Sequence, residues 1–146
     1  HEKCASSYGN VSNTYRLLGD YENALHYQLK KMNILEDIVA NASEMEECHR
    51  MVAVFYRFQN KHELSLKYAI KALDYGKKAF EKAPIRLAFS YTCLANCQKE
   101  AGLYDDALKN YYTAIDIYTL ADDVNGIEQV IEKINEIKKA NNNELK

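Results

Sequence analysis

Two cysteines, Cys93 and Cys97, stand four residues apart, so a helix would place both thiols on one face. With a third ligand, such a pair could hold a soft metal ion or act as a thiol site. No Cys-x-x-Cys motif and no nearby histidine accompanies them, which favours packing or surface thiols over a metal or thiol enzyme. The four histidines are scattered along the chain and suggest no catalytic constellation. We therefore expect no enzymatic activity, no metal and no cofactor.

The composition limits the class of protein. The chain has 146 residues, a formal net charge of −2, 47% hydrophobic residues and 27% charged residues, which is typical of one ordinary domain. General nucleic-acid binding is not expected, because such domains are usually basic. No apolar run of about 18 residues is present, so we expect no transmembrane helix and no membrane partner. Four cysteines form no disulfide framework at this length, which predicts a reducing, cytoplasmic location. Because the chain opens with His1 rather than Met, we expect a fragment of a longer protein.

One pattern recurs three times and organises the whole chain. Gly19, Asn60 and Gly102 stand 41 and 42 residues apart, and each lies between two stretches with helical spacing of apolar residues. Before each turn the copies share a bulky residue, an apolar residue and a small residue, and after it they share a small residue. The aligned positions are Tyr8, His49 and Tyr91; Val11, Val52 and Leu94; Ser12, Ala53 and Ala95; and Ala24, Ser65 and Ala107. Seven residues further on stand Lys31, Ala72 and Ala114.

This pattern resembles the tetratricopeptide repeat (TPR) family. Small residues in that pattern let the two helices of a unit approach closely, and bulky residues fill the space toward the next unit. The period exceeds the usual 34 residues, which favours the long-repeat branch with longer helices. Within it, the segment Gly9–Gly19 resembles the Pins/LGN family of TPR proteins, and kinesin light chain is similar in period.

The resemblance implies an all-α fold, namely an α-α superhelix (TPR solenoid) of three helix-turn-helix repeats and a C-terminal capping helix. Ser43 and Glu46 have the form of a capping box at the start of the second repeat. Gly76 predicts a kink or an early helix end, and Pro84 suits the first turn of a helix. We expect a single domain over 1–140, with repeats at about 2–41, 44–83 and 84–120, a capping helix at about 123–140 and a disordered tail at 141–146.

The resemblance also implies a peptide-binding groove along the first helix of each pair. Arginine suits the recognition of carboxylates, and asparagine amides can donate to and accept from a peptide backbone. Met51 adds to the apolar patches between the charges. The alternative for each cation is a solvated helix face or an ion pair with a neighbouring glutamate. The predicted groove residues are Asn10, Asn13, Arg16, Arg50, Val54, Arg57, Phe58, Phe89, Asn96 and Lys99.

These residues predict a non-enzymatic interaction scaffold, or adaptor, that binds a linear, acidic peptide segment with apolar anchors. The alternative function is self-association, in which tyrosine-rich apolar surfaces of the terminal repeats pair with another copy or with a longer TPR array.

Overall fold

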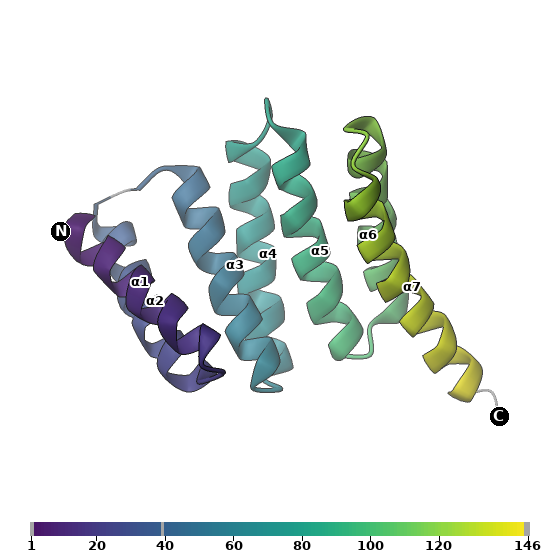
Figure 1. The fold of residues 1–146 in the computed structure, drawn as a ribbon, viewed down its shortest axis with the longest axis horizontal. Helices are drawn as coiled ribbons and strands as arrows, with labels where there is room; N and C mark the ends of the chain where they lie inside the picture. The colour runs from purple at the N-terminus through teal and green to yellow at the C-terminus, as the bar shows by residue number, and fades with distance from the viewer. Residues whose placement is uncertain (1, 39, 145–146) are drawn as a thin grey trace.

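The computed structural model describes residues 2–38 and 40–144. Within these ranges the chain forms seven α-helices and no strand, and consecutive helices pack side by side in chain order (Figure 1). The arrangement is an α-α superhelix of antiparallel pairs, as the sequence predicts. The helices are α1 (Glu2–Leu17), α2 (Tyr21–Asp37), α3 (Ala42–Phe58), α4 (His62–Ala79), α5 (Pro84–Glu100), α6 (Tyr104–Leu120) and α7 (Val124–Glu144).

The turns inside the pairs share one geometry. Gly19 and Gly102 have φ angles of 76° and 77°, in the left-handed region that favours glycine. Asn60 occupies the same conformation at φ 58°. In each turn a backbone N–H donates to the carbonyl five residues earlier, as in the Schellman motif. These bonds are Asp20 to Tyr15 at 2.9 Å, Lys61 to Tyr56 at 3.0 Å and Leu103 to Gln98 at 2.8 Å.

Small residues bring the two helices of each pair together. Ala24, Ser65 and Ala107 are completely buried at the matching position of the three pairs. The Ser12 hydroxyl donates to the Ala24 carbonyl at 2.7 Å, which shows how closely α1 approaches α2. This contact confirms the packing role that the repeat pattern assigned to its small residues.

The first two repeats also share an aromatic contact. Tyr15 stacks on Tyr27 with 5.6 Å between the ring centroids, and one repeat later Tyr56 stacks on Tyr68 at the same distance. In the third repeat a hydrogen bond donated by the Asn110 amide takes the place of this stack. The pairs are therefore structural copies whose differences can be assigned to particular residues.

The capping box predicted at Ser43 and Glu46 is wrong. Asn41 caps α3 instead: its side chain accepts from the Glu44 N–H at 3.0 Å and donates to the Glu44 carboxylate at 2.9 Å. The amide of Asn41 can make both bonds at once. Glu46 is thereby free for a different role and is almost completely buried.

Three helices end away from the predicted bounds, which placed the ends of the first two repeats at about 41 and 83 and the end of the capping helix at about 140. α2 ends at Asp37, and α4 ends at Ala79 with its last turn closed by the Phe80 N–H on the Gly76 carbonyl. Gly76 is needed for close packing, since a Cβ there would lie 2.8 Å from the Ser90 Oγ. α7 continues through residues 141–144, which we predicted as a disordered tail; the remaining tail positions, 145–146, lie outside the described residues.

Candidate peptide-binding hollow

A hollow of about 740 Å³ opens between α1 and α3. We call it the α1–α3 hollow. Half of the predicted groove residues line it, namely Asn10, Asn13, Arg16, Val54 and Phe58. Sequence reasoning missed other residues that line it, namely Ser12, Tyr21, Gln28, Lys31 and Phe55.

Lys31 is the residue that distinguishes this place from the later repeats. The matching residues, Ala72 and Ala114, are completely buried, whereas Lys31 extends a long side chain beneath α1. Gly9 leaves room for it, since a Cβ on Gly9 would lie 3.3 Å from the Lys31 Cδ. No Cα of α1 lies within 8 Å of a Cα of α3, although α3 and α5 do approach that closely. Lys31, which is larger than the alanines of the later repeats, thus lies where α1 and α3 are further apart than α3 and α5.

The floor of the hollow follows from a second difference between repeats. Gln28 in α2 matches Tyr111 in α6, and both side chains are buried. The Gln28 amide donates to the Cys48 Sγ at 3.3 Å and leaves the space above it open. The Tyr111 ring reaches further, and its hydroxyl donates to the Asn96 side chain. Tyrosine therefore fills in the third repeat the space that glutamine leaves open in the first.

One side of the hollow is apolar. Tyr21 stacks on Phe58 with ring centroids 4.4 Å apart, and Phe55 lies fully buried beside them. Phe58 itself is 46% exposed, and Met51 and Val54 extend the apolar surface along α3. Burial of apolar side chains against such a surface is favourable by about 25 cal/mol per Å². This wall can accept an apolar anchor from a ligand.

The opposite side carries amides and cations. The side-chain oxygen Oδ1 of Asn13 accepts from the Arg16 Nε and Nη2, at 3.0 and 2.7 Å, which orients the guanidinium. Among the described residues no carboxylate pairs with Arg16, whereas the Lys31 Nζ lies 4.0 Å from a Glu47 oxygen. Asn10 is exposed at the wall. An anionic ligand would meet one oriented guanidinium and one ammonium group that is weakly paired.

The structure assigns Arg50 to the fold rather than to the groove opening. Its Nε donates to the Glu46 carboxylate at 2.8 Å, and the Ser90 hydroxyl donates to the same oxygen at 2.8 Å. Glu46 is 2% exposed, so this carboxylate needs both bonds to offset its lost hydration. Arg50 is therefore a partner of a buried charge.

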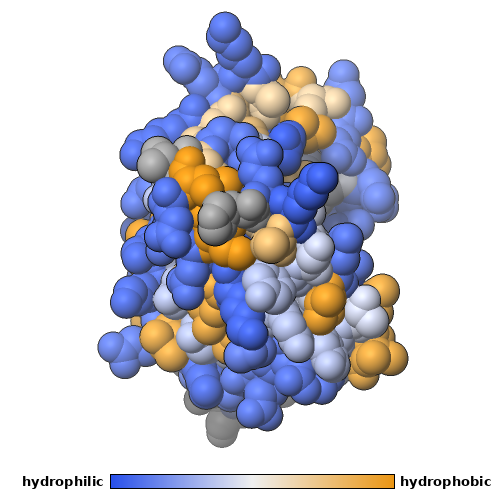
Figure 2. Space-filling view, turned by 90° about the vertical axis from the view of Figure 1, so that its left-hand side faces the viewer, coloured by the Kyte–Doolittle hydropathy of each residue, from blue (hydrophilic) through white to orange (hydrophobic). Residues whose placement is uncertain are grey.

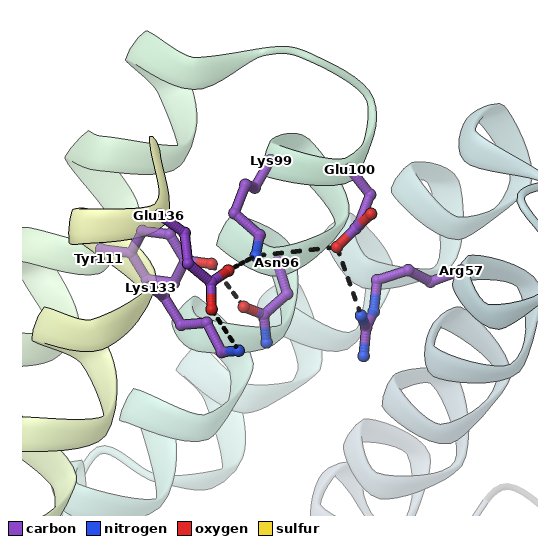
Figure 3. A network of polar contacts seen from close by, with 7 residues as sticks. All are labelled: Arg57, Asn96, Lys99, Glu100, Tyr111, Lys133 and Glu136. Carbon is purple, nitrogen blue, oxygen red and sulfur yellow. Dashed lines mark hydrogen bonds and ion pairs between the residues drawn. The ribbon is translucent and has the colours of Figure 1, made fainter. Parts of the chain in front are cut away.

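Three more predicted residues belong to a polar network that reaches α7 (Figure 3). We call it the α5–α7 network, and it consists of Arg57, Asn96, Lys99, Glu100, Tyr111, Lys133 and Glu136. Lys99 pairs with Glu136 and, at 3.8 Å, with Glu100, which in turn lies 4.0 Å from Arg57. The contact with Lys99 holds the pKa of Glu136 below its usual range. Partial burial acts in the opposite direction, and the contact with Lys133 lowers the pKa further. These cations face carboxylates of the same chain.

Phe89 lies away from the hollow. It is 49% exposed near the start of α5, and its ring lies 6.5 Å from that of Tyr118. Five of the ten predicted groove residues surround the hollow. The other five, Arg50, Arg57, Phe89, Asn96 and Lys99, lie outside it.

The cysteine pair is part of the core. Cys93 and Cys97 are buried in a cluster with Ala53, Ala69 and Leu73 between α3, α4 and α5. Over residues 2–38 and 40–144, no group of three or more His, Cys, Asp or Glu side chains is arranged to hold a metal ion. None of the described helices is long and apolar enough to cross a membrane.

Stacked helical pairs define the fold class of this protein, an α-α superhelix. Residues 4–37, which cover nearly all of α1 and α2, match the family model described as tetratricopeptide repeat. The match supports a tetratricopeptide repeat family, whose members generally mediate protein–protein interactions and typically lack catalysis. No curated protein matches the chain. The narrower resemblance to Pins/LGN or kinesin light chain stays a prediction.

One signal in the sequence could have located the hollow. Lys31 is the exception in a column that otherwise holds alanine, and exceptions of this kind mark places where a repeat departs from close packing. The Gln28 column varies in every repeat, with Ala69 in the second and Tyr111 in the third. Neither could be interpreted without knowing which side chains share one space.

Proposed function

We propose that this domain is a protein-interaction scaffold that binds a linear segment of a partner protein in the α1–α3 hollow. The observation that supports this proposal is the hollow itself, with apolar residues and Glu47 on α3, amides and Arg16 on α1, and Lys31 on α2. Ligand sites commonly combine a mostly apolar lining with a few placed polar groups, and their volumes fall in the same range.

The ligand segment carries a carboxylate next to an apolar side chain. Arg16, oriented by Asn13, receives the carboxylate, and Lys31 adds a second positive charge. The apolar side chain packs on the stacked rings of Tyr21 and Phe58. Asn10 bonds the peptide backbone, since an amide both donates and accepts.

This footprint is smaller than the one predicted from sequence. Arg50 pairs closely with Glu46 and Lys99 with Glu136, so a ligand would have to break those pairs to use them. Arg57 is only weakly paired, 4.0 Å from Glu100, but it does not line the hollow. Within the hollow the acidic preference therefore rests mainly on Arg16, and Lys31 adds a charge that the nearby Glu47 partly offsets.

A selection from a phage-displayed library of random linear peptides tests the proposal, with affinities of the enriched peptides measured at increasing salt. We expect enriched sequences to share a carboxylate beside an apolar residue, and their affinity to fall as salt rises. Arg16→Glu should weaken binding by about tenfold or more. Lys109→Glu, at an exposed site on α6, is the charge-matched control and should leave binding unchanged.

Two outcomes contradict the proposal. One is the absence of any enriched peptide. The other is enrichment of peptides whose affinity falls equally in Arg16→Glu and Lys109→Glu, since that result reports only the net charge of the protein.

A further inference from the structure

Three charged residues line the α1–α3 hollow, namely Arg16 on α1, Lys31 on α2 and Glu47 on α3. The proposed function gives a role to the two cations and none to the carboxylate. Among the described residues that line the hollow, Glu47 is the one with an acidic side chain. Its position restricts which peptide segments the hollow can bind.

The Glu47 carboxylate is more accessible than the Lys31 ammonium group beside it. The side chain of Glu47 is 52% exposed, whereas that of Lys31 is 19% exposed and lies against Gly9 of α1. Their charged atoms are 4.0 Å apart, which is too far for a hydrogen bond, so Lys31 neutralises the carboxylate only in part. A ligand residue that enters this end of the hollow therefore meets a negative charge first.

The fold does not require a charge at the position of Glu47. The matching residues of the other repeats are Ser6 and Phe89. The adjacent Glu46, in contrast, is almost completely buried and accepts a hydrogen bond from Ser90 of the next repeat. Of these two neighbouring glutamates, Glu47 is the one that a ligand can contact.

Arg16 and Glu47 lie at different heights along the hollow. Arg16 stands three residues before the turn residue Gly19, and Glu47 stands thirteen residues before the matching turn residue Asn60. Because α1 and α3 run in the same direction (Figure 1), this difference in register corresponds to about 15 Å along the helices. An extended peptide spans that distance in about four or five residues.

We propose that Glu47 selects a basic residue in the bound segment, about four or five residues from the carboxylate that Arg16 receives, and rejects an acidic residue there. This inference rests on the proposed function, since it concerns a segment bound in the same hollow. A positive charge beside Glu47 is attracted and a negative charge is repelled, and such complementarity contributes to specificity more than to affinity.

The surface around the first repeat supports a role for charge in selection. Figure 2 views the molecule from the end that α1 and α2 form, and hydrophilic surface borders smaller apolar areas there. A segment that reaches the hollow from this end therefore meets polar groups as well as apolar ones. We expect the hollow to prefer a segment with an acid at one end and a base at the other over a uniformly acidic segment.

The probe is the tightest-binding peptide enriched on the wild-type protein in the library selection. Each position up to six residues from its essential carboxylate, on either side, is replaced in turn by lysine, glutamine or glutamate, and fluorescence anisotropy measures the affinity. At about four or five residues on one side, we expect lysine to bind about tenfold more tightly than glutamate, with glutamine between them. Directly beside the carboxylate, close to Arg16, this preference for lysine should be absent.

Two variants of Glu47 test its role. Glu47→Gln should remove the preference, and Glu47→Lys should reverse it. Glu128→Lys is the matched control, since it makes the same change in net charge at an exposed site on α7, and it should keep the wild-type preference. Circular dichroism checks that all three variants stay folded.

Equal affinities for lysine and glutamate at every position would overturn the inference and leave the proposed function standing. Equal shifts in Glu47→Lys and Glu128→Lys would also overturn it, because that result reports only the net charge of the protein. The absence of any enriched peptide contradicts the proposed function, and this inference with it.

Discussion

The two ends of the inner surface use the same repeat positions in opposite ways. Between α1 and α3, Arg16 faces open space and Lys31 stands at the mouth of a hollow. Between α3 and α7, Arg57 and Lys99 pair with carboxylates of the same chain. One difference lies in the second helix of each pair, where Lys31 occupies a column that later holds Ala72 and Ala114, and Gln28 occupies a column that later holds Ala69 and Tyr111. Equivalent positions in the repeats therefore have different surroundings, open at Arg16 and paired within the chain at Lys99.

The largest expected effect is on the free energy of unfolding, and it should differ between two arginines, one from each region. Arg50→Ala should lower the free energy of unfolding by about 3 kcal/mol, because it leaves the buried Glu46 carboxylate without its charged partner. Arg16→Ala should change it by no more than about 0.5 kcal/mol, because Arg16 bonds only an exposed amide. Urea unfolding of both variants measures the difference.

The double variant Glu46→Ala/Arg50→Ala is the control. Alanine occupies the same position in the other repeats, at Ala5 and Ala88, so removing the carboxylate should restore most of the lost stability. Equal losses in Arg16→Ala and Arg50→Ala would contradict the assignment of Arg50 to the fold.

The next effect concerns the separation of α1 from α3. Lys31→Ala copies the later repeats and should weaken binding of an acidic peptide by about tenfold, because both the charge and the spacing side chain are lost. Lys31→Met keeps the length of the side chain and should remove mainly the salt-dependent part of the affinity. Identical affinities of the two variants at high salt would show that Lys31 contributes charge alone.

A smaller effect on the free energy of unfolding is expected for Tyr111, which is buried in the third repeat. Tyr111→Phe removes the hydroxyl that donates to the Asn96 side chain and should lower the free energy of unfolding by about 1 kcal/mol. Thermal or urea unfolding measures it. Peptide affinity should not change, since Tyr111 lies outside the α1–α3 hollow. A lower peptide affinity in this variant would extend the binding site into the third repeat.

The smallest effect concerns the ion pairs of α7. Glu136→Gln should lower the free energy of unfolding by less than about 1 kcal/mol, since exposed ion pairs contribute little. The pKa of Glu136 is held below its ordinary 4.5 mainly by Lys99, so its contribution is complete above that value and is lost as the pH falls through the lower, folded-state pKa.

Comparing wild type with Glu136→Gln in urea between neutral and acidic pH measures this contribution. The difference should shrink as the pH falls below 4.5. Glu128→Gln, which removes one carboxylate at an exposed position of the same helix, is the charge-matched control. If the difference in the free energy of unfolding between wild type and Glu136→Gln grew toward acidic pH, it would contradict a lowered pKa for Glu136.

The repeats and their turns were predictable because they depend on local rules. Gly19 and Gly102 adopt the left-handed turn that the sequence indicated, and the small residues at Ala24 and Ala107 lie where helices meet. Helix ends were less accurate, since Asn41 and Ser43 were equally good caps by residue type and only the path of the chain selected one of them. Half of the predicted groove residues lie around the hollow.

By itself, the sequence determined that the chain is a stack of helical pairs, because turn chemistry and apolar spacing act over a few residues. Only the tertiary structure decided which cations are available to a ligand. Glu46 and Arg50 are one helical turn apart, but Ser90 joins them from another repeat, and Glu136 reaches Lys99 from α7. Such pairings depend on distances between side chains far apart in the sequence, and those distances exist only once the repeats have packed.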